Sequence, residues 1–209
     1  MADPLPSRSR RLVLWEGIDE WRAEAVTMEL GATGIRARGV QLGADPLPYR
    51  LDYRLAAPTF VTESLEVDVA GDGWGRSLRL ARGAGGEWTI DAGAEGDPPL
   101  GPPGGDAAAV RGAIDCDLGL SPLTNLLPIR RDRLHEKAAH ADYVMAWVSV
   151  PDLGVIAYPQ RYEHVRRHGD GSVVRFLSLG VDEGFQADLE LDREGLVVVY
   201  PGLARRVAP

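Results

Sequence analysis

Cysteine and lysine are almost absent from this sequence of 209 residues. Cys116 is the only cysteine, so no disulfide can form within the chain, as is usual for proteins of reducing compartments. We therefore expect a cytoplasmic location. Lys137 is the only lysine among 23 basic residues, and we attach no function to this bias.

Long apolar runs are missing as well. The first residues, MADPLPSRSRRLVLW, contain no apolar stretch long enough for a secretory signal. No later stretch approaches the roughly 20 apolar residues of a transmembrane helix. The net charge of −8 argues against a binder of duplex nucleic acid and against a polybasic membrane-surface protein. The sequence therefore predicts no nucleic-acid partner and no transmembrane segment, and it leaves the oligomeric state open.

Common catalytic and cofactor signatures are also lacking. The sequence has no G-x-S-x-G, no P-loop and no G-x-G-x-x-G string. Its four histidines, at positions 135, 140, 164 and 168, do not have the spacing of three or four converging zinc ligands. We therefore expect neither a metal site nor a cofactor.

Alternating apolar and polar residues dominate what is present. In residues 61–69 (VTESLEVDV) the apolar side chains recur at every second position, which is typical of a half-buried β-strand. The 25 glycines and 15 prolines suit short strands joined by turns. Further strand-like stretches cover residues 24–30, 35–42, 49–56, 77–82, 139–150, 155–167, 172–179, 185–191 and 196–200.

Helix signals are weak and one loop is long. Residues 120–127 could form a short helix, with Ser121 as its N-cap and Pro122 at its first position. Residues 91–112 are mostly Gly, Pro, Ala and Asp, and a loop of this length is either functional or disordered. We predict a flexible N-terminus (1–9) followed by a single, mainly β domain (10–209) with a flexible loop at 93–111.

Two carboxylates two residues apart are the first candidate site. Asp115 and Asp117 lie on a predicted strand, so they share a face, with their backbones about 6 to 7 Å apart. Such a pair could supply the acid and base of a glycosidase or gather a cation. Alternatively, each could be solvated, cap a backbone group or pair with an arginine. Cys116 between them points to the other face, and we expect a buried thiol.

Polar residues in two further stretches could meet a ligand. Arg130 and Arg131 are expected on a strand, so that only one of them lines any cleft, where it could bind a carboxylate or phosphate. A salt bridge to Asp115 or Asp117 is the alternative. In the strand 155–167, Gln160 and Tyr162 share one face and Arg161 the other. An amide and a phenol beside apolar walls are typical of a site for a polar-headed ligand, although both could be structural.

Several strings resemble a known family. They are LWEG (14–17), YRLDY (49–53), IDCDLGLSPLTNLLPIRR (114–131), PQRY (159–162) and FQADLELDREGLVVVYPGLARRV (185–207). Together they resemble a bacterial glycolipid-binding protein family over residues 12 to 207. The resemblance implies a spiral β-roll, a curled antiparallel half-barrel similar to lipoprotein carriers that hold lipid on a concave apolar face. It also implies ligand-binding roles for Asp115, Asp117, Asn125, Arg130, Arg131, Gln160, Arg161 and Tyr162.

Three functions remain open on this basis. The first is a non-catalytic protein that holds a glycolipid or another lipid, an amphiphilic small molecule, on a concave sheet face. The second is a hydrolase of glycosyl or acyl bonds that uses Asp115 and Asp117. The third is a small β-protein whose motif residues are structural. We favour the first.

Overall fold

The computed structural model describes residues 9–180, 182 and 184–207. The predicted flexible N-terminus therefore lies outside the described residues, except Ser9, which begins the first strand. In this part of the chain there are fourteen strands and one helix: β1 (Ser9–Gly17), β2 (Arg22–Leu30), β3 (Ile35–Gly43), β4 (Tyr49–Ala57), β5 (Ser64–Gly71), β6 (Trp74–Arg82), β7 (Trp88–Glu95), β8 (Asp115–Leu118), α1 (Leu126–Arg131), β9 (His140–Val148), β10 (Val155–His168), β11 (Gly171–Ser178), β12 (Gln186–Leu191), β13 (Val197–Tyr200) and β14 (Ala204–Arg206).

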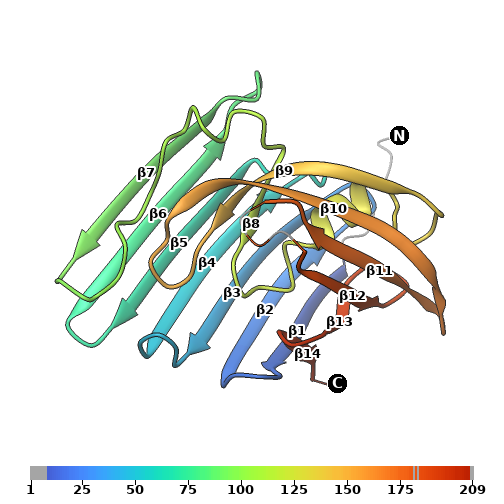
Figure 1. Cartoon of the computed structure of the whole chain (residues 1–209), viewed down its shortest axis with the longest axis horizontal. Helices are drawn as coiled ribbons and strands as arrows, with labels where there is room; N and C mark the ends of the chain where they lie inside the picture. The colour runs from blue at the N-terminus through green and yellow to red at the C-terminus, as the bar shows by residue number, and fades with distance from the viewer. Residues whose placement is uncertain (1–8, 181, 183, 208–209) are drawn as a thin grey trace, which may run out of the picture.

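All fourteen strands form one curled sheet that does not close. Its order is β7-β6-β5-β4-β3-β2-β1-β14-β13-β12-β11-β10-β9-β8, so β7 and β8 are its two edges. Every neighbouring pair is antiparallel except β8 and β9, which run parallel. The meander β1–β7 forms one wall, and β9–β13 arch back over it (Figure 1). The predicted fold class, a mainly β curled half-barrel, is confirmed.

Alternation along each strand decides which side chains face the inside of the curl. In β3 the burial alternates strictly from Ile35 to Gly43, because successive side chains of a strand point to opposite faces of the sheet. The same alternation runs through β2 and most of β4 and β5, where Val26, Leu51 and Leu65 are completely buried. The period of two in the sequence of these strands thus separates the side chains that face the inside of the curl from those that face outward.

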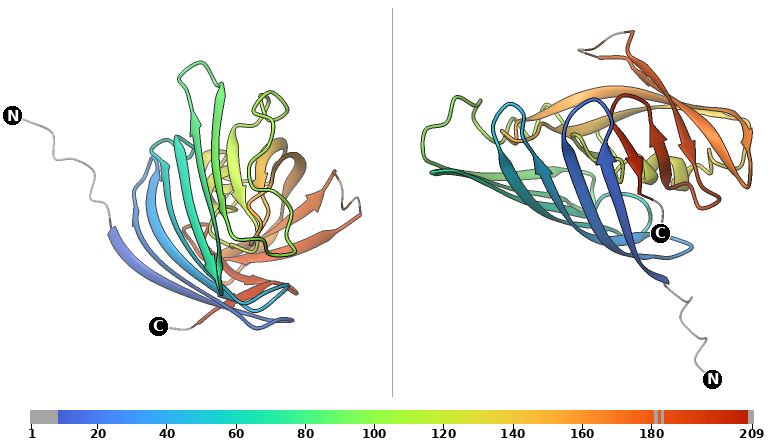
Figure 2. Two further views of the ribbon diagram at one scale, coloured as in Figure 1. Left: turned by 90° about the vertical axis from the view of Figure 1, so that its left-hand side faces the viewer. Right: turned by 90° about the horizontal axis from the view of Figure 1, so that it is seen from below.

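The chain itself fills the inside of the first half of the curl. Val110, Leu118, Leu123 and Leu126 are buried in the same hydrophobic cluster as the inward side chains of β1–β6. Figures 1 and 2 show β8, α1 and the preceding loop lying between the two arms of the sheet. The inner face of β2–β6 is therefore core rather than an open trough. A second cluster, which includes Tyr162 and Leu189, occupies the inner side of β9–β13.

The helix expected at residues 120–127 is wrong in position. The structure has α1 at Leu126–Arg131, with Asn125 as its N-cap residue. Leu120 has a φ of +62°, and the Ser121 hydroxyl donates to a carboxylate oxygen of Glu24, 97 residues away in sequence. Residues 120–124 form turns and bends rather than a helix. Arg130 and Arg131 end a helix, and their expected placement on a strand is also wrong. No described helix is long and apolar enough to cross a bilayer.

The Gly/Pro-rich loop begins later than predicted and is tied to the sheet near its middle. Residues 93–95 belong to β7, so the expected boundary at 93 is wrong. The amide of Gly104 donates to the Leu153 carbonyl at 2.9 Å, and the Val155 amide donates to the Gly104 carbonyl at 2.8 Å. Val110 is completely buried. Gly104 is thus hydrogen-bonded to the segment 153–155, so the flexibility predicted for 93–111 can apply only to the loop residues before and after Gly104.

Hydrogen exchange can test whether Gly104 is held while neighbouring loop residues are flexible. We expect the Gly104 and Val155 amides to exchange slowly, because both are hydrogen-bonded between the loop and the segment 153–155, and the amides of the exposed residues Gly105 and Asp106 to exchange fast. Mass-spectrometric exchange with overlapping peptides provides the measurement. Uniformly fast exchange from 97 to 112 would show that the Gly104 anchor does not persist in solution.

Candidate functional site

A pocket between the inner side of β10–β13 and the segment 117–125 is the best candidate site. Its volume is about 190 Å³. Polar groups from the family-like strings, Asp117, Asn125 and Gln160, line it together with aromatic rings. We call it the aromatic pocket, after the side chains of Trp147, Tyr158, Phe176, Phe185 and Tyr200 that line it.

A connected hydrogen-bond network holds the polar groups of the aromatic pocket. Asp117 accepts from the Thr124 hydroxyl at 2.8 Å and, on its other oxygen, from the Gln160 side-chain amide at 2.6 Å. The Tyr162 hydroxyl lies 2.9 Å from Asn125 Oδ1 and 3.2 Å from Gln160 Oε1. Four of the predicted site residues are therefore brought together. Gln160 and Tyr162 share a face, as the sequence predicts.

Asp117 keeps unused acceptor capacity toward the aromatic pocket. Burial raises the pKa of Asp117, while the hydrogen bonds from Gln160 and Thr124 lower it. A carboxylate has about four lone-pair positions, and these two partners use one on each oxygen. The remaining positions can accept hydroxyl groups of a ligand, which suits recognition of a polyol better than that of an anion.

The walls of the aromatic pocket are rings at stacking distances. Trp147 and Tyr158 have ring centroids 5.8 Å apart, and the ring centroid of Phe176 lies 6.0 Å from that of Phe185 and 6.3 Å from that of Tyr200. Phe185 is 47% exposed although it is a large apolar residue. It therefore presents an apolar surface to solvent beside the pocket.

A second cavity adjoins the aromatic pocket. It has a volume of about 300 Å³ and shares Phe185, Tyr200 and Leu203 with the pocket. The turn between β1 and β2 contributes Asp19 and Glu20 to its other side. A ligand longer than one headgroup could continue from the aromatic pocket past Phe185 into this cavity.

Asp115 lies in a separate polar cluster from Asp117. It is completely buried, and its two oxygens accept from the Thr62 amide at 3.2 Å and from the guanidinium of Arg131. Burial raises the pKa of Asp115, and the Arg131 charge opposes this shift. The structure thus realises the predicted alternative of an ion pair. Asp115 has no open face toward a substrate, so the two carboxylates cannot both approach one glycosidic bond.

The predicted arginines do not join the aromatic pocket. Arg130 lies over the Phe60 ring at 5.0 Å and donates to the Glu194 carbonyl at 2.9 Å, while Arg131 lies over Tyr143 at 5.1 Å. Both line a cavity at the opposite end of α1, so the expectation that only one can line a cleft is wrong. Arg161 is paired with Asp142 at 2.5 and 2.8 Å, on the other face of β10 from Gln160.

Cys116 is a buried free thiol, as predicted. Its sulfur lies 3.4 Å from the Thr62 hydroxyl, and burial raises the pKa of the thiol to about 12. Since the thiolate is the reactive form, Cys116 is unreactive at neutral pH. Within the described residues, no group of three or more His, Cys, Asp and Glu side chains could hold a metal ion.

Sequence reasoning missed a buried acid behind the aromatic pocket. Glu24 is only 3% exposed, and one of its oxygens accepts from the hydroxyls of Tyr53 at 2.5 Å and Ser121 at 2.7 Å. Burial raises the pKa of Glu24 to about 7. Its other oxygen has no partner among the described residues. The signal was present in the alternation of EAVTMEL, because Glu24 shares the face of Val26 and Met28.

Comparison with known families identifies the chain. Residues 12–206 match the model of the family described as "Putative glycolipid-binding". The chain belongs to this family. The resemblance drawn from the sequence strings is thereby confirmed over nearly the whole chain. Among curated proteins no match is found.

Two solved structures are similar to this member of the glycolipid-binding family. A DUF1089 family protein from Pseudomonas aeruginosa has a TM-score of 0.67 and 25% sequence identity, with 88% of this chain and 92% of that chain covered. A β-barrel-like protein of the DUF1849 domain from Brucella abortus has a TM-score of 0.46 and 7% identity, with 97% of each chain covered. The first shares the curled fold.

Proposed function

We propose that this protein binds an amphiphile with a sugar headgroup without chemically altering it, and that the headgroup enters the aromatic pocket. The observation that carries the proposal is the junction of aromatic walls with the network of Asp117, Gln160, Asn125 and Tyr162. Ligand sites typically combine mostly apolar walls with a few fixed polar groups that orient the ligand. The family's name supports a glycolipid as the ligand class.

The size of the aromatic pocket limits what can enter. Sites for drug-sized ligands measure about 300–1,000 Å³, whereas this pocket measures about 190 Å³. It therefore suits a single small headgroup. The acyl chains would lie outside it, along the apolar side of the adjoining cavity that Phe185, Pro201 and Leu203 form. The ligand thus uses the inner side of β10–β13, since the inner side of β2–β6 is filled core.

Binding explains the site better than hydrolysis does. A two-carboxylate mechanism needs both groups beside the scissile bond, and Asp115 is enclosed by Thr62 and Arg131. Asp117 is held by an amide and a hydroxyl, with no cation bonded to it among the described residues. We also propose that the protein works in the cytoplasm, in line with its single, free cysteine.

Binding of an octyl glycoside below its micellar concentration, measured by calorimetry, tests the proposal. We expect Phe185→Ala and Asp117→Asn each to weaken binding about 5- to 30-fold, because a ring contact or a paired polar contact contributes roughly 1–2 kcal/mol. Ile156→Ala is the matched control, since Ile156 is exposed on β10 and does not line the pocket.

Two results would contradict the proposal. One is binding that is unchanged in both pocket variants. The other is turnover of nitrophenyl glycosides or esters that disappears in Asp117→Asn while the melting temperature is kept, which would favour the hydrolase. Native mass spectrometry of protein purified from its own host would show which lipid, if any, is carried.

A further inference from the structure

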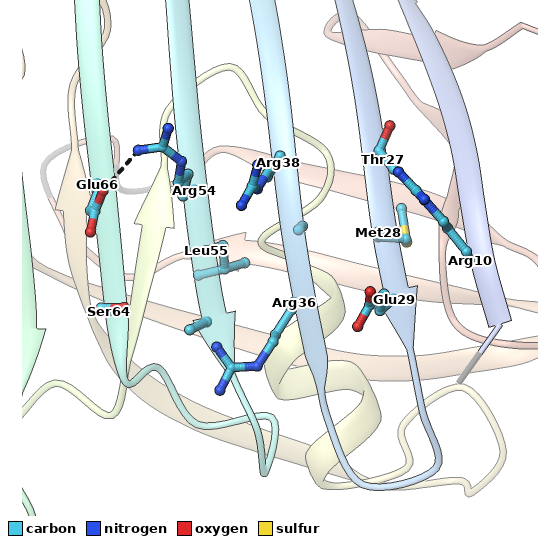
Figure 3. A pocket seen from close by; sticks show the side chains of 12 residues that line it. Arg10, Thr27, Met28, Glu29, Arg36, Arg38, Arg54, Leu55, Ser64 and Glu66 are labelled. Carbon is cyan, nitrogen blue, oxygen red and sulfur yellow. Dashed lines mark hydrogen bonds and ion pairs between the residues drawn. The ribbon is translucent and has the colours of Figure 1, made fainter. Parts of the chain in front are cut away.

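The outer face of β1–β5 carries a groove lined by four arginines. The groove has a volume of about 490 Å³, and Arg10, Arg36, Arg38 and Arg54 line it (Figure 3). We call it the arginine groove. Two carboxylates, Glu29 and Glu66, also line it, so positive charge is in excess. It lies on the opposite face of the sheet from the core.

Strand register places like charges side by side in the arginine groove. Arg38 of β3 is directly opposite Arg54 of β4, whereas Arg36, two positions away on the same face, is opposite Glu29 of β2. Like charges directly opposite on neighbouring strands destabilise a sheet. Arg54 is paired with Glu66 at 3.2 Å, as the dashed line in Figure 3 shows. Arg36 and Arg38 form no ion pair with any described residue, and a bound anion would relieve their repulsion.

An apolar surface continues from the arginine groove. Leu12 lies opposite Thr27, which lies opposite Arg38, so leucine and arginine belong to one row across the sheet. The next cavity, of about 360 Å³, shares Thr27, Arg38, Arg54 and Glu66 with the groove, and Leu12, Ala25 and Val40 also line it. Two carboxylates line its far side, Asp52 and Asp68, and each is paired with an arginine, Arg50 and Arg79 respectively. Exposed large apolar residues follow from the groove toward the β1–β2 turn: Leu12 (66%), Leu14 (41%), Leu42 (39%) and, in the turn, Trp21 (67%).

We propose that this outer face docks on a lipid bilayer with anionic headgroups. Lipid phosphates would bind Arg36, Arg38 and Arg54, because the planar guanidinium fork matches phosphate oxygens. Leu12, Leu14 and Trp21 would enter the headgroup boundary, where tryptophan is favoured. Basic groups near an anionic surface strengthen attachment, and the effect is local, so it is compatible with the net charge of −8.

A second copy of the chain fits this face less well. A two-fold dimer sets the same patch against itself. The arginine groove of one copy would then meet the arginines of the other, and their repulsion would have to be overcome. An anionic bilayer supplies the complementary charge and an apolar layer together.

The docking proposal does not depend on the proposed glycolipid site, but docking would place that site close to a membrane. The turn between β1 and β2, which carries Trp21, contributes Asp19 and Glu20 to the cavity beside the aromatic pocket. If the aromatic pocket binds glycolipid, a docked molecule holds that cavity near the surface from which the ligand comes. Vesicle binding and glycoside binding can fail separately, because they use opposite faces of the sheet.

Flotation with vesicles tests the docking. We expect the full chain to float with vesicles of 70% phosphatidylcholine and 30% phosphatidylglycerol, and not with pure phosphatidylcholine. Raising the salt from about 0.05 to 0.5 M should weaken binding, because exposed charges are screened. The double variant Arg36→Gln/Arg38→Gln should bind about 10- to 30-fold more weakly. Leu12→Ser/Trp21→Ser should also bind more weakly.

A matched control separates the groove from charge in general. Arg161→Gln/Arg175→Gln removes two partly exposed arginines of β10 and β11, outside the groove and paired with Asp142 and Asp188, and should bind the mixed vesicles as the wild type does. The proposal is overturned if the chain floats equally with pure phosphatidylcholine, if the groove variant binds normally, or if 10 mM inorganic phosphate abolishes flotation at constant ionic strength. Sedimentation that shows a dimer broken by Leu12→Ser/Trp21→Ser would also overturn it, in favour of a second copy.

Discussion

Arg131→Met is expected to lower the free energy of unfolding by about 3–5 kcal/mol. The substitution leaves the carboxylate of Asp115 without its cation in a completely buried position, and an uncompensated buried charge costs this much. Methionine keeps an unbranched apolar side chain at this position but lacks the guanidinium that lies over the Tyr143 ring. Urea denaturation gives the free energy, and the melting temperature should fall by roughly 6–20 °C for a chain of this size.

Two further variants test whether the loss of stability in Arg131→Met comes from the uncompensated buried charge of Asp115. Arg161→Met breaks an exposed ion pair with Asp142 and should cost about 0.2–1 kcal/mol. The double variant Asp115→Leu/Arg131→Met should recover much of the loss, because replacing both buried charges by apolar groups is often neutral or stabilising. Equal losses for the Arg131 and Arg161 variants would contradict a buried pair.

Stability is expected to fall by about 3 kcal/mol as the pH rises from 4.5 to 7, through Glu24 alone. Its pKa is raised from 4.5 to about 7 by burial, so in this window the folded state holds a proton that the unfolded state has released. The contribution is complete below pH 4.5 and is lost above pH 7, at about 1.36 kcal/mol per unit. Urea denaturation at several pH values measures it.

Glu24→Gln should remove this part of the slope and make the protein more stable than the wild type at pH 8. The amide oxygen can still accept from Tyr53 and Ser121, and its amide group would face the region where Gln41 has no partner among the described residues. Burial also raises the pKa of Asp115 and Asp117, so some slope remains in the variant. Glu29→Gln, on the exposed face of the same strand, is the control. A variant as pH-dependent as the wild type would contradict the buried ionisation.

Local patterning predicted the strands, because a period of two depends only on neighbours in sequence. The faces of Gln160, Arg161 and Tyr162 followed in the same way. What the sequence could not show is which distant residue meets each polar group. Asp115 and Asp117 share a face, yet Thr62 and Arg131 enclose one while Thr124 and Gln160 hold the other.

Two other expectations depended on the same missing information. The helix lies at Leu126–Arg131 rather than at 120–127, and Ser121, its expected N-cap, instead bonds to Glu24 on β2, a partner that the local sequence does not reveal. The net charge of −8 argues against a polybasic membrane-surface protein, and the docking proposal depends instead on where individual charges lie, which a sum over the chain does not report. Arg38 and Arg54 are 16 residues apart in sequence and directly opposite in the sheet.

The meeting of the first and last strands in the middle of the sheet has a consequence for synthesis. β1 pairs with β14 through Trp15–Arg206, Glu16–Arg205 and Gly17–Ala204. The meander β1–β7 needs only contacts between neighbouring hairpins, so it can form early on the ribosome. Until residue 206 emerges, one edge of β1 has no partner, and open edges invite pairing with other chains. A nascent chain, or a chain cut before β14, would therefore aggregate more readily than one in which β14 covers that edge.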